Sequence, residues 1–179
     1  MSNSSQLKAV EKRLKKYLNR DVPAARVTAT NKALAKAKTA VVRAVVVDTG
    51  IKTKLLKKRV YISRAKGGQK PKGAKLHFYR RGVSMISLGA KQVDGGVAAG
   101  QYLVPDAFIA DGSKGFGRGK LRQAHVLRRK GRGQYPLEVM VVNIKPAVNK
   151  ETPATVARVM KENFSRLYQH EIKRRAGRA

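Results

Sequence analysis

The feature that most constrains the fold of this chain is a central block of short apolar runs, residues 102–142, punctuated by glycine and proline. The runs cover 102–110, 124–130 and 134–142. Apolar runs of this length between glycine and proline are typical of short strands joined by loops. In the first run we expect the end of a strand, with Phe108 as an aromatic anchor in a core.

The chain before this block has helical patterns. Apolar residues recur every three or four positions over 7–18, which predicts an amphipathic helix with Lys and Arg on its other face. Residues 19–21 are expected to end that helix. A longer, alanine-rich helix is expected over 23–46, with Asp21 as its N-cap and Gly50 as its C-cap.

Shorter elements are expected next: a basic helix over 51–60, a loop at 65–74, strands at 60–63, 76–79 and 83–88, and a glycine-rich connection at 95–100. After the central block, residues 143–153 contain two prolines and are expected to form a linker. A final helix is expected to start at Thr152. Its apolar face comprises Val156, Val159, Met160, Phe164, Leu167, Tyr168 and Ile172.

Helices and strands are segregated along the chain, which indicates an α+β fold rather than alternating α/β. We therefore predict N-terminal helices and a C-terminal helix packed on a small, mostly antiparallel β-sheet. At 179 residues the chain fits one domain with extensions. We assign residues 1–5 to a disordered N-terminus, 6–172 to a single domain and 173–179 to a basic tail.

The charge of the chain restricts its partners. It has 41 Lys and Arg against 10 Asp and Glu, for a net charge of +31. Such an excess repels itself and favours an anionic partner: nucleic acid first, an acidic protein surface second and an anionic membrane a distant third. The absence of cysteine excludes disulfides and thiolate metal sites. We expect no secretory signal and no membrane span, because no apolar run is long enough.

Catalytic and metal-binding patterns were sought and not found. His77, His125 and His170 lack metal-ligand spacing, so we expect them to be structural. The glycine-rich segment 112–120 fails the phosphate-loop pattern, because Leu121 follows its final lysine. A flexible basic loop is the favoured interpretation, and a loop that reaches a phosphate backbone or a neighbouring subunit is the alternative. We expect no enzyme activity, no cofactor and no metal.

Basic residues occur in clusters along the whole chain. They are either solvated faces or contacts to an anionic partner, and the size of the net charge favours a partner. No sequence-specific nucleic-acid motif is present, so any nucleic-acid contact should be to phosphate and sensitive to salt. The candidate contact residues for DNA or a protein partner are Arg118, Lys120, Arg122, Arg128, Arg129, Lys130 and Arg132.

The order of several motifs resembles the minor tail protein Z family of lambda-like tailed phages. One block starts at Val22-Pro23-Ala24-Ala25 and leads into the alanine-rich helix, and a basic segment spans 48–60. The most specific block is Val104-Pro105-Asp106-Ala107-Phe108-Ile109, followed by His125-Val126 and then by Gln134-Tyr135-Pro136-Leu137-Glu138-Val139. The resemblance runs from about residue 7 to the C-terminus. Segments 65–74 and 112–119 depart from it, so no role is carried onto them.

The resemblance implies a structural virion protein that completes the tail at its head-proximal end, after assembly in the host cytoplasm. Similar subunits form rings, often sixfold, so the implied partners are other copies, the tail tube or tail terminator protein and neck proteins, with genomic DNA in the lumen as a further candidate and no membrane. Pro105, Phe108, Tyr135 and Pro136 would be structural anchors. The alternative is a free, non-sequence-specific nucleic-acid-binding protein, such as a packaging or RNA-associated factor. That alternative explains the charge equally well but explains less well why strands carry the central motif.

Overall fold

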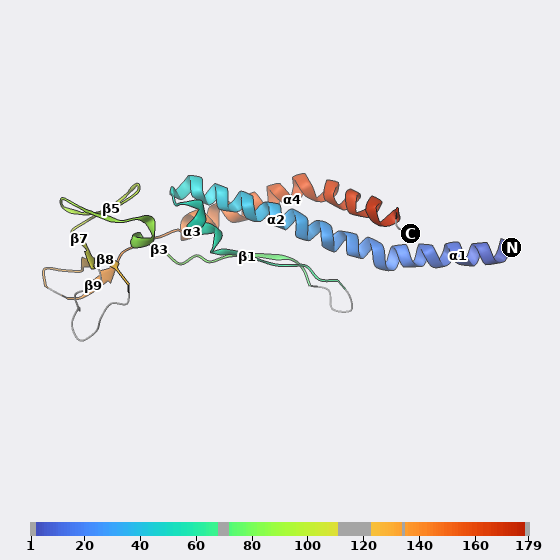
Figure 1. The fold of residues 1–179 in the computed structure, drawn as a ribbon, viewed down its shortest axis with the longest axis horizontal. Coiled ribbons are helices and arrows are strands. Elements are labelled where there is room, and N and C mark those ends of the chain that lie inside the picture. Colours follow the sequence, from blue (N-terminus) through green and yellow to red (C-terminus); the bar gives the residue numbers. More distant parts are fainter. Residues whose placement is uncertain (1–2, 68–71, 111–122, 134, 178–179) are drawn as a thin grey trace. The chain divides into compact units, whose positions relative to one another are not determined.

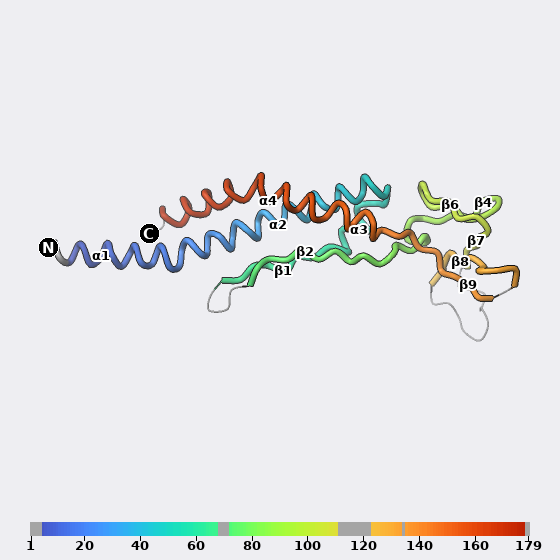
Figure 2. The backbone as a smooth tube through the Cα atoms, turned by 180° about the vertical axis from the view of Figure 1, so that it is seen from behind, coloured from blue at the N-terminus to red at the C-terminus, as the bar shows by residue number. Residues whose placement is uncertain are grey.

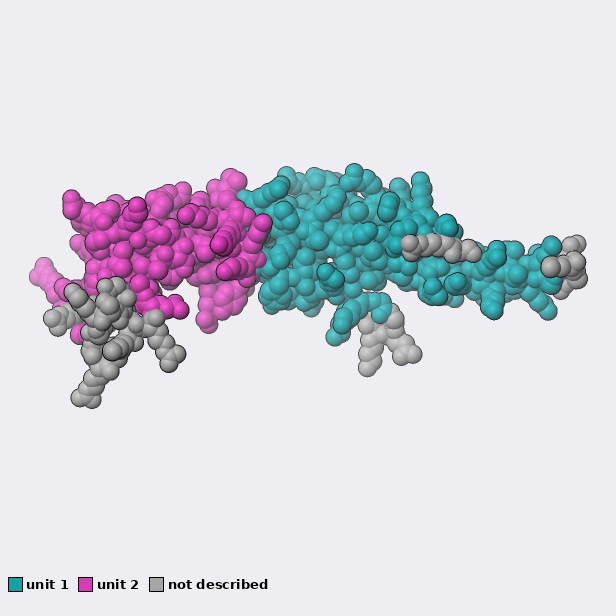
Figure 3. Space-filling model, viewed as in Figure 1, with its two compact units in different colours: residues 1–44, 60–78, 151–179 teal, residues 45–59, 79–150 magenta. Residues whose placement is uncertain are grey.

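A computed structural model describes residues 3–67, 72–110, 123–133 and 135–177. The fold is α+β, as predicted: long helices lie at both ends of the chain and antiparallel strands lie between them (Figure 1). The residues group into two compact units (Figure 3), the first formed by 1–44, 60–78 and 151–179 and the second by 45–59 and 79–150. Each unit is described by itself. The single domain predicted for 6–172 stays a prediction.

The N-terminal helices are continuous, so the predicted break at 19–21 is wrong. Helix α1 (Asn3–Lys16) passes through a π-helical turn, η1 (Tyr17–Asp21), into α2 (Val22–Thr49). Proline at position 23 has no N–H, and its ring would crowd the carbonyl four residues earlier in an ordinary turn. The wider turn accommodates it, and the Val22 N–H donates to the Tyr17 carbonyl instead. Asp21 therefore lies buried inside the helix and is no N-cap.

Helix α2 buries a stripe of small residues. Ala25, Ala29, Ala33 and Ala37 follow at intervals of four and are fully buried. Residues at this spacing share one face of a helix, and the absence of large side chains lets another element approach closely. The helix ends as predicted: Gly50 has a φ of 63°, and its N–H donates to the Val46 carbonyl at 2.8 Å.

The C-terminal helix α4 (Lys145–Ala176) starts earlier than predicted, so the linker expected over 143–153 is wrong. Asn143 caps it, because its Oδ1 accepts the Lys145 N–H at 3.0 Å. Pro146 lies in the first turn, where a missing N–H costs nothing. Pro153 lies inside the helix. It removes one internal hydrogen bond, and the helix continues through it.

In the first unit, α2 and α4 run antiparallel beside a β-hairpin (Figures 1 and 2). The hairpin consists of β1 (Val60–Ser63) and β2 (Lys75–Phe78), in the register Tyr61↔His77. Its inner face completes a small core: Leu34, Ala37 and Val159 are buried, and Ile62 and Leu76 pack against them. The hairpin therefore places the polar side chains that follow Ile62 in the sequence opposite helix α2.

The described residues of the second unit form the short helix α3 (Thr53–Lys57), the 3-10 helix η2 (Met85–Leu88) and eight further strands. These strands form three small antiparallel sheets. The sequence had predicted a single sheet with the helices packed on it. One sheet has the order β4-β5-β6, another β7-β8-β9, and the third pairs β10 with β3. Their bounds are β3 Val83–Ser84, β4 Lys91–Val93, β5 Gly96–Ala99, β6 Tyr102–Pro105, β7 Ala107–Ala110, β8 His125–Arg129, β9 Leu137–Val139 and β10 Val141–Val142.

Two segments of the second unit differ from the prediction. Of the strand expected over 83–88, only Val83 and Ser84 are extended, and η2 follows. The glycine-rich connection expected over 95–100 contains the central strand β5. Gly96 is needed there because a Cβ at this position would lie 2.2 Å from the Val104 carbonyl oxygen on β6. A glycine that permits close strand approach has the same appearance in sequence as a glycine in a loop.

The first run of the central block is divided at Asp106, which has a φ of 55°. Its N–H donates to the Gly95 carbonyl at 2.9 Å. Asp is among the few residues that tolerate this left-handed conformation. The chain therefore leaves β6 and enters β7 in a different sheet, with Ala107 and Ala110 buried.

Candidate functional site

The predicted contact residues that lie within the described chain gather around the end of β8 and the turn into β9. Arg128 lies on β8 opposite Glu138 on β9. Its Nη2 is 3.7 Å from Glu138 Oε2, and both side chains are about half exposed. Glu138 thus neutralises part of the charge of Arg128, which makes Arg128 the least available cation of this group.

The other three cations face solvent. Arg129 ends β8, and Lys130 and Arg132 lie in the turn that follows. The Arg129 guanidinium lies 6.0 Å from the centroid of the Phe108 ring, within cation–π range. The Lys130 N–H donates to the Pro136 carbonyl at 3.1 Å, which closes the turn. We define the basic turn as Arg129, Lys130 and Arg132.

The remaining predicted contact residues, Arg118, Lys120 and Arg122, lie outside the described residues. The proposed anchors are placed as follows. Pro105 ends β6 and is exposed, and Tyr135 is 64% exposed and precedes Pro136 in a cis peptide bond. Phe108 is half-buried on β7, while its neighbours Ala107 and Ala110 are fully buried. The anchoring role of these four residues stays a prediction.

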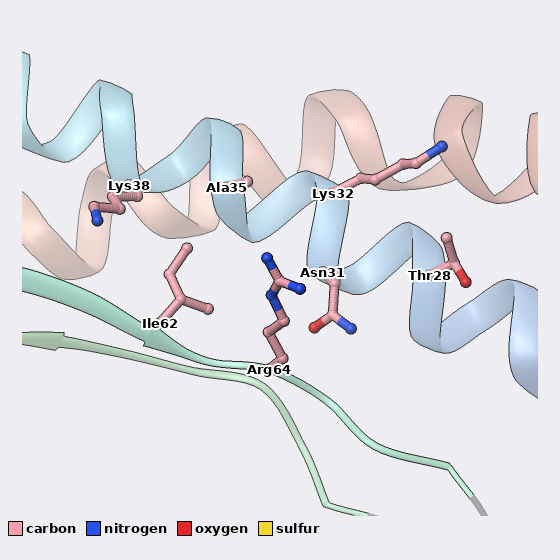
Figure 4. Close-up of a pocket in the computed structure, with 7 residues that line it drawn as sticks. All are labelled: Thr28, Asn31, Lys32, Ala35, Lys38, Ile62 and Arg64. Atoms are coloured by element: carbon pink, nitrogen blue, oxygen red, sulfur yellow. The ribbon is translucent and has the colours of Figure 1, made fainter.

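A second polar feature is a groove of about 530 Å³ in the first unit, between α2 and the hairpin (Figure 4). Arg64 and Ile62 point from the hairpin side toward α2, and Lys38 lies at the same groove. Asn31 fixes the hairpin to the helix: its Nδ2 donates to the Ala65 carbonyl at 3.1 Å, and its Oδ1 accepts the Ala65 N–H at 2.7 Å. The lining residues are three cations, one amide, one hydroxyl and two apolar side chains.

The third lysine or arginine of this groove, Lys32, extends toward α4 (Figure 4). There it donates to Glu171 Oε1 at 2.6 Å. Arg174 donates to the other carboxylate oxygen of Glu171 at 2.7 Å, and His170 Nδ1 lies 3.9 Å from Oε1. Glu171 is fully buried, whereas Lys32 and Arg174 remain partly exposed.

These contacts lower the pKa of Glu171 from its ordinary value of 4.5 to about 2. The hydrogen bond from Lys32 is the largest cause, burial opposes it, and the hydrogen bond and charge of Arg174 add to the lowering. Glu171 is therefore ionised at neutral pH and joins α2 to α4. Its role is structural, because its oxygens are occupied by the protein's own cations.

Sequence reasoning missed this carboxylate, although a signal was present. Glu171 stands four residues after Leu167 and three after Tyr168, within the spacing of the apolar face. An acid in an apolar stripe predicts a buried, paired charge.

Among the described residues, no group of three or more His, Asp or Glu side chains is arranged to hold a metal ion.

Comparison with protein families decides the affiliation. The family model of the prophage minor tail protein Z (GPZ) matches residues 7–177. The chain belongs to this family. It is therefore a structural protein of a phage tail and a component of the virion, in agreement with the resemblance carried by the central motifs.

Neither the comparison with curated proteins nor that with solved structures finds a match. In the described part of the chain, no helix is both long and apolar enough to cross a membrane.

Proposed function

We propose that this minor tail protein completes the tail at its head-proximal end and makes the tail competent for joining a head and delivering DNA. Membership of the minor tail protein Z family over residues 7–177 is the observation that carries this proposal. The net charge of +31 supports it. A subunit at the end of a DNA conduit meets phosphates in the lumen and other virion proteins on its remaining surfaces, and a strong positive charge favours both contacts.

We propose that the basic turn makes the contact to these phosphates or to the other virion proteins. Its three cations are exposed. No acid pairs with them in the described part of the chain, in contrast to Arg128 and its partner Glu138. An unpaired surface cation can contact phosphate or carboxylate without first breaking an ion pair, and each contact to DNA would release counterions. We propose further that several copies form a ring, which would place this turn repeatedly around the lumen or on one face.

The first experiment is negative-stain microscopy of lysates from a host producing the phage without this gene. Full heads beside tails of normal length, or joined particles that do not infect, are the expected result. Defective or empty heads beside normal tails would contradict tail completion and would favour packaging. In that case the basic turn would be a nucleic-acid site of a free protein.

A charge-reversal variant tests the basic turn itself. Arg129, Lys130 and Arg132 are changed to Glu, and Arg128 is left alone because a reversed charge there would face Glu138. The matched control reverses Arg158, Lys161 and Arg166, three exposed cations on α4. We expect the turn variant to lose infectivity by at least tenfold and the control to keep it. Equal infectivity of the two variants would remove the basic turn from the proposal.

Association with the virion separates the proposed role from a free nucleic-acid-binding protein. Purified particles are sedimented in high salt, which screens phosphate contacts. A tail component should stay with the particles, because packed protein interfaces tolerate salt. Loss of the protein from the particles as salt rises would instead indicate binding through phosphate alone.

A further inference from the structure

Helix α1 and the π-helical turn η1 that continues it carry an apolar stripe that the described chain leaves uncovered. Leu7, Val10, Leu14 and Leu18 are 70%, 61%, 54% and 54% exposed. We define these four residues as the α1 stripe. Large apolar side chains scattered singly on a surface are ordinary, but four on one face of one helix form a contiguous patch.

The register between α2 and α4 explains why α4 does not cover the stripe. Arg175 bonds Thr28, and Glu171 bonds Lys32, so the two helices run antiparallel with the end of α4 opposite the first turns of α2. Helix α1 precedes those turns. It therefore continues past the described end of α4, as Figures 1 and 2 show.

The spacing of the stripe matches a narrow helix–helix seam. Leu7, Val10 and Leu14 follow at intervals of three and four, the spacing of heptad positions a, d and a. Such a stripe is narrower than the apolar face of a helix that packs into a globular core. A single amphipathic helix of a partner therefore fits it better than a flat surface does.

The charges beside the stripe select the partner. Arg13 flanks this seam on one side and Glu11 flanks it on the other, and Lys8, Lys12 and Lys16 make the rest of α1 basic. Of the two acids in the segment, Glu11 pairs with Lys15 and Asp21 with Arg20. Residues 3–16 carry five cations against one acid, so a second copy of α1 would bring together two helices of net positive charge, whereas carboxylates of a partner would neutralise that charge.

We infer that the α1 stripe binds an amphipathic α-helix of another protein, with apolar residues at heptad spacing flanked by Asp and Glu. The contact combines burial of the four apolar side chains with an ion pair to Arg13 and attraction to the remaining positive charge of α1, in a helix–helix mode of peptide recognition. It is separate from the basic turn, so it does not depend on the role proposed for that turn.

The test measures binding of labelled synthetic peptides to the full chain by fluorescence anisotropy. One peptide has Leu at a and d positions flanked by Glu. A second keeps every Glu but has Gln in place of each Leu, and it measures attraction by charge alone. We expect the first peptide to bind at least tenfold tighter, because burial of two or more leucines accounts for that factor.

Two protein variants locate the contact. In Leu7→Gln/Leu14→Gln the preference for the first peptide should disappear, and helix content is preserved because Gln and Leu have similar helix propensity. Arg13→Glu should weaken binding of the first peptide more than Lys12→Glu, which makes the same change in charge on the opposite face. Circular dichroism confirms that each variant is folded.

Several results would overturn the inference. Equal binding of the two peptides, or an unchanged preference in the Leu7→Gln/Leu14→Gln variant, would show that the stripe takes no part. Sedimentation velocity provides the other decisive reading. A dimer of the wild-type chain that Leu7→Gln/Leu14→Gln converts to monomer would assign the stripe to a second copy. Binding of the stripe to anionic vesicles, with no preference between the peptides, would assign it to a lipid surface.

Discussion

Replacing Glu171 with Gln tests whether the buried carboxylate joins α2 to α4. The folded protein lowers the pKa of Glu171 from 4.5 to about 2. A shift of this size corresponds to roughly 3 kcal/mol of stabilisation at neutral pH. Removing one member of a buried ion pair costs about 3–5 kcal/mol. We expect the low end of that range or less, because Lys32 and Arg174 are partly exposed and can return to water.

The dependence on pH has a definite sign. Because the folded pKa lies below the unfolded pKa, Glu171 stabilises the fold fully above about pH 4.5. That contribution disappears as the pH falls through about 2, where the folded carboxylate becomes protonated. The wild type and Glu171→Gln should therefore differ most at neutral pH and converge toward pH 2.

The assay is urea unfolding followed by helix circular dichroism, since urea does not screen charges as guanidinium does. Glu162→Gln is the matched control: it removes the same charge from an exposed position on the same helix. Its expected effect is below about 0.5 kcal/mol, as for surface ion pairs. The reasoning fails if Glu171→Gln is as stable as the control at pH 7, or if the difference between them is the same at pH 7 and pH 2.

Two predictions concern the second unit. Gly96→Ala should destabilise it by roughly 1–3 kcal/mol, because the new methyl would meet the Val104 carbonyl oxygen at 2.2 Å. The control is Gly131→Ala, because a Cβ at that position would meet no atom within 4 Å. Equal urea midpoints of the two variants would contradict the strand pairing. Tyr102→Phe should cost about 1 kcal/mol, because the hydroxyl donates to the Thr49 carbonyl at 2.5 Å, and an unchanged free energy of unfolding would show that this bond contributes nothing.

Local patterns in the sequence were sufficient where one element buries one face. Apolar residues at intervals of three and four predicted α1 and most of α2, and Gly50 marked the end of α2. The strand at 60–63 was also correct. For the candidate site, the sequence located the cluster of cations at 128–132, but it could not separate Arg128, which faces Glu138, from the cations of the basic turn. That distinction depends on the pairing of two strands.

By itself the sequence determined the α+β class, the strong positive charge and the order of motifs that the minor tail protein Z family shares, because these depend on composition and local spacing. Only the tertiary structure decided which local signals prevail. Pro23 lies inside a continuous helix because the wider turn before it accommodates its ring, and α4 continues through Pro153. Gly96 lies in a strand because a neighbouring carbonyl leaves no room for a Cβ. Glu171 is buried with counter-charge from Arg174 nearby in sequence and from Lys32, which is 139 positions away and is brought close only by the packing of α2 against α4.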